Sequence, residues 1–290
     1  MIDATETLLK EIIDRLNNVE HRSASPGAVY LGEGKVLCRV IMPTNLQRDV
    51  LMIVDGKDRL LGPRMIMDGY HEKPATNFFL ANVRSNSNCI DVGANIGYFT
   101  CILARLAWRG KVLSIEADPV MCEQLNGNIQ INWVSNNARI INAGAAAEPG
   151  NITLYRRPNY SGNTGMSRHG YDDSEASKLA FTARTIALDS LLPDIDGRCD
   201  FLKIDIEGAE PLAFRGAKEL LKQNPQIKIV FEWSPEQIRL CDCEPEELVE
   251  ILRDAGLSPY RLADDGSTTA CTWPEISRSD YDNFVAMSYS

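Results

Sequence analysis

The chain of 290 residues has a hydrophobic content of 44% and a formal net charge of −10. This length accommodates one large α/β domain, or one core domain with an N-terminal addition. The acidic balance argues against a nucleic-acid partner, because phosphate contacts require a basic face and no Lys/Arg cluster is present. The sequence also contains no run of eighteen apolar residues that would span a bilayer.

The N-terminus and the cysteines predict a cytoplasmic protein. Residues 1–6 are acidic and lack the apolar segment of a secretory signal. The eight cysteines are spread singly apart from Cys241 and Cys243, whose spacing differs from that of a C-x-x-C pair. We therefore expect reduced thiols that pack as small apolar side chains.

Residues 1–68 are expected to form an extension of one helix and short strands. Apolar residues between Ile2 and Val19 recur at three- and four-residue steps, which predicts an amphipathic helix. This helix must bury its apolar stripe, either on the body of the protein or in a homodimer contact. Two strands, 35–41 and 50–54, alternate enough to form a hairpin or meander around residues 43–45.

Residues 69–290 are expected to form the second and larger domain. An apolar helix is predicted over 77–83, and strand and helix patterns alternate regularly from Cys89 onward. Such alternation is typical of an α/β fold with a doubly wound, mostly parallel sheet. The expected strands are 89–92, 111–115, 138–142, 201–205 and 228–232, with a weaker last strand over 283–287.

The segment from Cys89 to Tyr98 is the most informative part of the chain. It is predicted to form a buried strand that turns through Gly93 and Gly97 into a helix ending near Ala107. Glycines lack the Cβ atoms that would stop a ligand from approaching the backbone. The unpaired N–H groups at the helix start face whatever lies in the turn. The segment therefore predicts a cofactor site.

The next strand indicates which cofactor binds there. It ends in Glu116, which is placed to accept hydrogen bonds from ribose hydroxyls. The middle glycine of a dinucleotide turn is replaced by Asn95, and Asp91 is placed to meet a cation, which favours S-adenosylmethionine over NAD. The expected cofactor contacts are Asp91, Gly93, Asn95, Gly97, Tyr98, Glu116, Ala117, Asn142 and Asp205.

A stretch of nearly sixty residues separates the third strand from Phe201, and its part 159–166 is polar and rich in turns. Loops of this length are usually functional or disordered, and in an open α/β sheet they lie near the strand ends where ligands bind. We expect this segment to be a loop that covers the substrate.

A second group of acids follows the strand that begins at Phe201. Asp205 and Glu207 come at its carboxyl end, and the neighbouring strand ends in Glu232. Acids at adjacent strand ends could hold or deprotonate a substrate hydroxyl, or bind a divalent cation. Alternatively, Glu207 or Glu210 only stabilises the start of the next helix. We expect no metal, because residues 232–234 lack the aspartate–asparagine pair of the metal-dependent catechol type.

Together these motifs resemble the FkbM family of S-adenosylmethionine-dependent methyltransferases. The resemblance is carried by D-V-G-A-N-I-G-Y-F-T at 91–100, I-E-A-D-P at 115–119, L-D-S-L-L at 188–192 and K-I-D-I-E-G-A-E at 203–210. It implies a class I methyltransferase (Rossmann-like) fold, Glu116 on the ribose, and the 93–97 turn around the methionine part. It also implies methyl transfer to a hydroxyl oxygen of a sugar or natural product, such as a polyketide or glycan.

The resemblance runs from about Gly69 to the C-terminus. Residues 69–72 look like the family's entry motif, although His71 stands where a more apolar residue is usual. Transfer to oxygen requires alignment of the hydroxyl and removal of its proton. The candidate catalytic residues are His71, His169, Asp205 and Glu207, and the expected substrate contacts are Tyr70, Glu72, Asn163 and Glu232.

Two other classes of function stay open at this point. A catalytically silent binding module would share the same fold, because fold alone does not separate an enzyme from a binder. An NAD-dependent oxidoreductase is disfavoured by Asn95 in the turn.

Overall fold

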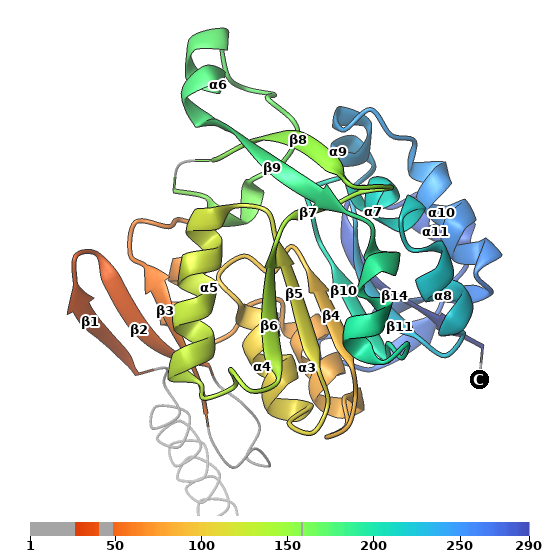
Figure 1. The fold of residues 1–290 in the computed structure, drawn as a ribbon, viewed down its shortest axis with the longest axis horizontal. Coiled ribbons are helices and arrows are strands. Elements are labelled where there is room, and N and C mark those ends of the chain that lie inside the picture. Colours follow the sequence, from red (N-terminus) through yellow and green to blue (C-terminus); the bar gives the residue numbers. More distant parts are fainter. Residues whose placement is uncertain (1–26, 41–48, 158, 290) are drawn as a thin grey trace, which may run out of the picture.

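The computed structural model describes residues 27–40, 49–157 and 159–289. The helix expected over 2–19, its dimer contact and the turn expected around 43–45 lie outside these residues. The described chain is built around an eight-stranded sheet in the order β13-β12-β14-β11-β10-β4-β5-β6 (Figure 1).

The centre of the large sheet confirms the predicted parallel strands. The five parallel neighbours are β11 (Lys228–Trp233), β10 (Phe201–Ile204), β4 (Cys89–Val92), β5 (Val112–Glu116) and β6 (Ala138–Asn142). The chain fills the sheet outward from β4 through β5 to β6, then returns to the other side of β4 with β10 and β11. This reversal between β4 and β10 leaves a crevice at the carboxyl ends of the strands, where ligands bind in open α/β sheets.

The far side of the sheet contains antiparallel strands. The weakly predicted last strand is confirmed as β14 (Asp282–Ser288), which runs antiparallel to both β11 and β12 (Leu257–Leu262). The edge strand β13 (Thr268–Ala270) pairs with β12. Neither β12 nor β13 was predicted, because β12 is interrupted by Pro259 and Arg261 and β13 is only three residues long.

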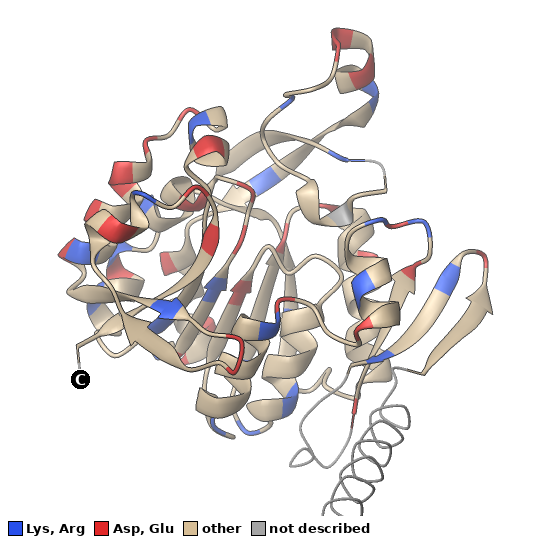
Figure 2. Ribbon diagram, turned by 180° about the vertical axis from the view of Figure 1, so that it is seen from behind, with Lys and Arg blue, Asp and Glu red and all other residues tan. Residues whose placement is uncertain are grey.

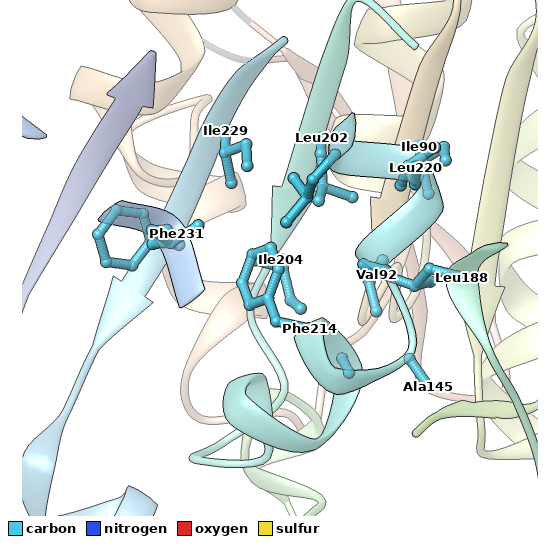
Figure 3. Packing of buried hydrophobic residues seen from close by; sticks show 14 of the residues in the cluster. Ile90, Val92, Ala145, Leu188, Leu202, Ile204, Phe214, Leu220, Ile229 and Phe231 are labelled. Carbon is cyan, nitrogen blue, oxygen red and sulfur yellow. The ribbon is translucent and has the colours of Figure 1, made fainter. Parts of the chain in front are cut away.

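Alternate side chains of the central strands enter two separate cores. Ile90, Leu202 and Ile204 belong to one core, whereas their strand neighbours Cys89 and Phe201 belong to the other. This is the two-residue period of a sheet that is covered on both faces. Figure 3 shows the first core, in which Phe214 and Leu220 pack over the strand residues.

Helices cover both faces, as a doubly wound sheet requires. Residues of α3 (Lys73–Asn82), α4 (Tyr98–Leu106) and α5 (Pro119–Ile131) fill one core. The other core takes residues of the 3-10 helix η2 (Leu188–Ile195), α7 (Glu210–Arg215), α8 (Lys218–Gln223), α9 (Pro235–Leu240), α10 (Pro245–Asp254) and α11 (Trp273–Ile276).

The N-terminal extension contributes a small antiparallel sheet. It has the order β1 (Ala28–Gly32), β2 (Lys35–Val40) and β3 (Val50–Asp55), and it is followed by α2 (Leu61–Met67). The predicted pairing of the second and third strands is confirmed, with Leu37 opposite Ile53. The first strand was not predicted.

The segment between β6 and β10 is not the simple loop that was expected. Its strands β7 (Gly144–Ala145), β9 (Ala180–Ile186) and β8 (Gly150–Tyr155) form a third sheet, with the short helices η1 (Ser161–Asn163) and α6 (Asp173–Leu179) between β8 and β9. Figure 1 shows β8, β9 and α6 projecting from the end of the large sheet. The prediction of a loop was wrong because it rested on the polar residues 159–166 and not on the alternation of apolar and polar residues in the flanking strands β8 and β9.

The surface of the described chain mixes both signs of charge. Figure 2 shows Lys and Arg segments scattered among Asp and Glu segments on the helices and loops in view. Among the described residues, no helix has the length and apolar character needed to cross a bilayer.

Candidate active site

A cavity lies at the carboxyl ends of β4, β5 and β10, where the strand order reverses. We call it the central cavity. Its floor is the turn after β4 together with residues that follow β5, β6 and β10, and β8 and the loop after it supply another wall. It is lined among others by His71, Glu72, Gly93, Ala94, Asn95, Ile96, Tyr98, Glu116, Ala117, Ala143, Ile152, Leu154, Gly165, Met166, Lys203, Asp205 and Glu207. Residues between β6 and β10 therefore line this cavity, from a sheet and a loop together, and their covering of a substrate stays a prediction.

The two glycines of the turn pack closely against neighbouring segments of the protein. Gly93 has a φ of +78°, and a Cβ there would lie 1.9 Å from the carbonyl oxygen of Asp205. Gly97 has a φ of +92°, and its Cβ would lie 2.3 Å from a methyl carbon of Leu125 in α5. Both positions therefore require glycine for packing against Asp205 and Leu125, and the approach of a ligand to Gly93, which lines the cavity, stays a prediction.

Glu116 ends β5 inside the central cavity and also holds the turn. Its Oε2 accepts a hydrogen bond from the backbone N–H of Asn95 at 2.8 Å, and its Oε1 accepts one from that of Asp118 at 2.8 Å. Burial raises the pKa of this carboxyl to about 7, against the lowering effect of the backbone hydrogen bonds. Each carboxylate oxygen has a second lone pair, so hydroxyls can still donate to Glu116.

Asn95 presents a polar atom that the described protein leaves unpaired. Its Oδ1 is buried and has no hydrogen-bond partner among the described residues. Its backbone is left-handed with a φ of 49°, a conformation that asparagine tolerates better than most residues. A buried acceptor without a donor is costly, so this atom fits a ligand that brings a cationic or N–H donor.

Seven of the predicted site residues lie outside the lining of the central cavity, namely Tyr70, Asp91, Gly97, Asn142, Asn163, His169 and Glu232. Asp91 is buried under the turn, where its Oδ2 accepts a hydrogen bond from Thr100 at 2.6 Å. Asn142 is exposed and donates to the backbone oxygens of Glu116 and Ala117 from outside. Gly97 forms the N-cap of α4. Tyr70 is half-buried and lies under the ammonium of Lys73.

A charged network joins the other wall of the cavity. Lys203, which the sequence analysis did not select, is buried on β10 and donates to Oδ2 of Asp205 at 3.2 Å. Burial opposes its charge, but the surrounding carboxylates, Asp205 and Glu72 foremost, outweigh burial and raise its pKa. The only sequence signal was a lysine inside the apolar strand F-L-K-I.

His71 and Glu72 form one pair in this network. Nε2 of His71 lies 2.8 Å from Oε1 of Glu72, and Nδ1 of His71 is buried without a partner among the described residues. Burial opposes ionisation of Glu72. The hydrogen bond from His71 and the charges of His71, Lys203 and Arg64 together outweigh it and lower the pKa of Glu72 to about 2. The imidazole is therefore fixed by a carboxylate at the cavity wall.

Glu207 has the properties of a proton acceptor. Burial, then the charges of Asp205 and Glu210, raise its pKa to about 8. Its φ of 58° is left-handed, a strained conformation of the kind found at functional sites. Gln237 of α9 donates from Nε2 to its Oε2. A carboxyl with this pKa is a stronger base than an ordinary glutamate and is still partly ionised at neutral pH.

The neighbouring acids have different positions. Glu210 accepts a hydrogen bond from the backbone N–H of Ile206 at 2.8 Å and so shapes the turn between β10 and α7. Glu232 is buried at the end of β11 outside the cavity lining, and its Oε2 has no partner among the described residues. Burial and the nearby carboxylates, Asp205 first, raise the pKa of Glu232 to about 10. It is therefore uncharged at neutral pH.

A second hollow adjoins the central cavity, and we call it the side cavity. It is lined by Arg157, Tyr160, Asn163, Gly165, Ser167, His169, Glu207, Gln237 and Leu240. Glu207 and Gly165 line both cavities, and a Cβ on Gly165 would lie 3.1 Å from the Cβ of Glu207. The structure thus brings together the predicted residues Asn163, His169 and Glu207.

No group of three or more His, Cys, Asp or Glu side chains suited to a metal ion occurs within the described ranges. The cavities are instead bordered by hydrogen-bonding groups and by the ion pair of Lys203 with Asp205.

The sheet order, the tight turn after β4 and the acid after β5 define a class of protein, the Rossmann-like α/β proteins that bind a nucleoside cofactor at the strand ends. Residues 91–258 match the model of the methyltransferase FkbM domain. The chain belongs to the FkbM methyltransferase family, and its fold is the class I methyltransferase fold that the sequence motifs implied.

Several individual proteins are similar to this chain. Methyltransferase sdnD of Sordaria araneosa is 26% identical over 207 residues, which cover 63% of this chain and 78% of that protein. The crystal structure of methyltransferase FkbM from Methylobacillus flagellatus KT has a TM-score of 0.46 and 16% identity, and covers 76% of this chain. This chain spans 50% of that chain's length. An O-methyltransferase from Bacillus cereus in complex with SAH has a TM-score of 0.42 and 16% identity, covering 75% of this chain and 80% of that chain.

Proposed function

We propose that this protein transfers a methyl group from S-adenosylmethionine to a hydroxyl oxygen of a sugar or natural-product acceptor. When bound, S-adenosylmethionine supplies a methyl carbon that its sulfonium has already activated. The observation that carries the proposal is the position of Glu207, a basic carboxyl that lines both cavities. One cavity then serves the donor and the other the acceptor.

The residues of the central cavity suit the donor. Glu116 offers carboxylate oxygens to the two hydroxyls of a ribose, and the unpaired Oδ1 of Asn95 offers an acceptor to the ammonium of the methionine part. The apolar side chains of Ile152, Leu154 and Met166 line the same cavity and exclude water from it. The predicted contacts Glu116, Asn95 and Asp205 therefore have a shared cavity to act in.

Glu207 is the better of the two candidate carboxylate bases. Asp205 is engaged by the ammonium of Lys203 at 3.2 Å, so one of its oxygens is already occupied by a protein donor. Glu207 has no such cation in direct contact among the described residues, and its raised pKa favours proton uptake from an acceptor hydroxyl. His71 is held in the central cavity by Glu72, whereas His169 lies in the side cavity, where it could contact an acceptor.

The side cavity suits an acceptor with several polar groups. Arg157, Asn163 and Ser167 provide donors and acceptors along one wall, and Gln237 provides an amide on the other. Tyr160 and Leu240 add apolar surface against which a sugar ring or a polyketide can pack.

Incubation with methyl-labelled S-adenosylmethionine and panels of sugars, glycosides and polyketide alcohols tests this function. We expect label in an alkali-stable methyl ether, turnover that continues in excess EDTA, and loss of turnover in Glu207→Gln with S-adenosylhomocysteine affinity kept. Binding of S-adenosylhomocysteine without turnover of any acceptor would support the silent binding module. NADH binding in its place would support the oxidoreductase. Activity lost to EDTA and restored by Mg²⁺ would contradict the metal-free reaction.

A further inference from the structure

Helix α5 lies between the small N-terminal sheet and the large sheet (Figure 1). Asn128, near its C-terminal end, and Asn132, the residue that ends it, are both 0% exposed. Residues four apart lie on one face of a helix. A buried amide destabilises the fold unless its donors and acceptor are paired, so two such residues on one face require partners.

Both asparagines pair with the free edge of β3 as a neighbouring strand would. The backbone N–H of Leu51 donates to Oδ1 of Asn132 at 2.9 Å, and that of Ile53 donates to Oδ1 of Asn128 at 2.7 Å. Each Nδ2 donates back to the carbonyl oxygen of the same strand residue, at 2.6 Å for Leu51 and 3.2 Å for Ile53. Two side-chain amides thus satisfy backbone groups that an edge strand otherwise exposes.

The two asparagines differ in their remaining hydrogen bond. Nδ2 of Asn132 donates to the carbonyl oxygen of Asn128 at 2.7 Å, within the same helix. Nδ2 of Asn128 donates to the carbonyl oxygen of Ile96 at 2.8 Å. Ile96 belongs to the turn after β4 and lines the central cavity. Asn128 alone of the pair therefore touches both the N-terminal sheet and the cofactor turn.

The contact of Asn128 is reinforced by its helix. Leu125, one turn earlier in α5, packs against Gly97, the residue that follows Ile96. Asn95, the residue before Ile96, is fixed by its N–H bond to Glu116. Three consecutive residues of the turn, 95–97, are therefore each in contact with Glu116 or α5, and the contact of Ile96 depends on Asn128.

We propose that Asn128 is a positioning residue that couples the N-terminal sheet to the cofactor turn, so that the extension supports cofactor binding. Removing this amide leaves the carbonyl of Ile96 without this donor and frees the turn to shift. The inference concerns cofactor binding alone and does not depend on which acceptor is methylated or on whether turnover occurs.

The pair supplies its own control. Asn128→Ala and Asn132→Ala each remove one buried amide and two hydrogen bonds to β3, so they should lower the melting temperature by similar amounts. Titration calorimetry with S-adenosylhomocysteine separates them. We expect Kd to rise roughly five- to tenfold for Asn128→Ala and by less than about twofold for Asn132→Ala. Equal changes in Kd for the two variants would overturn the proposal.

A measurement on the unaltered protein tests the same coupling if Asn128→Ala does not fold. Linkage is reciprocal, so a cofactor that orders the turn must also protect the strand that Asn128 joins to it. We expect saturating S-adenosylhomocysteine to slow hydrogen exchange of the Ile53 amide severalfold more than that of the Leu51 amide. Equal protection of both amides, or protection of neither, would show that Asn128 transmits nothing to the turn.

Discussion

Replacement of Glu116 by glutamine tests how the cofactor ribose is held. The side chain is 9% exposed, and each of its oxygens accepts a backbone N–H at 2.8 Å. Glutamine keeps the shape but turns one acceptor into an amide donor, which then faces the N–H of Asn95 or of Asp118. The variant therefore loses one hydrogen bond to the backbone of Asn95 or Asp118 and one acceptor for the ribose hydroxyls.

The size of the effect follows from these contacts. A buried donor left without its acceptor, together with weaker hydrogen bonds to the ribose, costs about 1–3 kcal/mol of binding free energy. That range raises the Kd for S-adenosylhomocysteine roughly 5- to 150-fold. Glu116→Ala should fall at the upper end, because both oxygens are removed.

The pKa of Glu116 adds a second signature. Burial, its largest influence, raises this pKa to about 7 in the free protein. Ribose hydroxyls donate to the ionised carboxylate, so the bound state favours ionisation and binding releases protons. Wild-type affinity should therefore increase as pH rises from 6 to 8 and level off above the pKa, whereas Glu116→Gln should lack this increase.

Calorimetry with S-adenosylhomocysteine at pH 6, 7 and 8, in buffers of different ionisation heat, measures both affinity and proton release. Asp118→Asn is the matched control, because Asp118 is a neighbouring buried acid outside the cavity lining. Its carboxylate caps α5 at Val120 and pairs with Arg156 at 2.6 Å, so this variant should change stability more than affinity. An unchanged Kd in Glu116→Gln, or a wild-type affinity that is independent of pH, would refute the ribose contact.

Three further predictions concern single positions. Gly93→Ala should lower the free energy of unfolding by about 2–4 kcal/mol in urea titrations, because its Cβ would collide with the carbonyl of Asp205; wild-type stability would show that the turn can move away from β10. Glu232→Gln should gain stability relative to wild type between pH 5.5 and 8. The reason is that Glu232 has a pKa of about 10 in the folded protein, so the free energy of unfolding of the wild type falls as pH rises above the pKa of a glutamate in the unfolded chain. Parallel pH profiles of the free energy of unfolding for the two proteins would contradict this sign. Gly165→Ala should raise the acceptor KM roughly tenfold and change the S-adenosylhomocysteine affinity less, because its Cβ narrows the junction of the two cavities at Glu207; a larger change in cofactor affinity than in acceptor KM would contradict this.

The sequence alone determined the architecture wherever a local pattern of residues was compatible with only one type of secondary structure. Apolar runs bounded by turns predicted the five parallel strands and β14, because strands buried on both faces are nearly continuous in hydrophobicity. The acid after the second strand predicted Glu116 in the cavity, since the carboxyl ends of parallel strands meet at one edge of the sheet. The same reasoning brought Asp205 and Glu207 to that edge.

The tertiary structure decided which of those residues face the cavity. Asp91 lies within β4, just before the turn, and its side chain is in a buried contact with Thr100, whereas Asn142 donates to the backbone of Glu116 from outside the cavity. The two-residue period of a strand predicts on which face of the sheet a side chain lies. It does not predict whether a side chain near the strand end lines the cavity, because that direction depends on packing. Lys203 was overlooked because its three carboxylate neighbours come from different parts of the chain.

The roles that depend on close approach between distant segments also required the structure. Gly93 packs against the carbonyl of Asp205, just after β10, and Gly97 packs against a methyl of Leu125 in α5. The edge of β3 is completed by Asn128 and Asn132, some 75 to 81 residues away. A sequence specifies local conformation through propensity and period, whereas such contacts arise only when packing brings the segments together. The family and the cofactor turn could therefore be predicted from the sequence, whereas the contacts that hold this turn in place could be identified only from the tertiary structure.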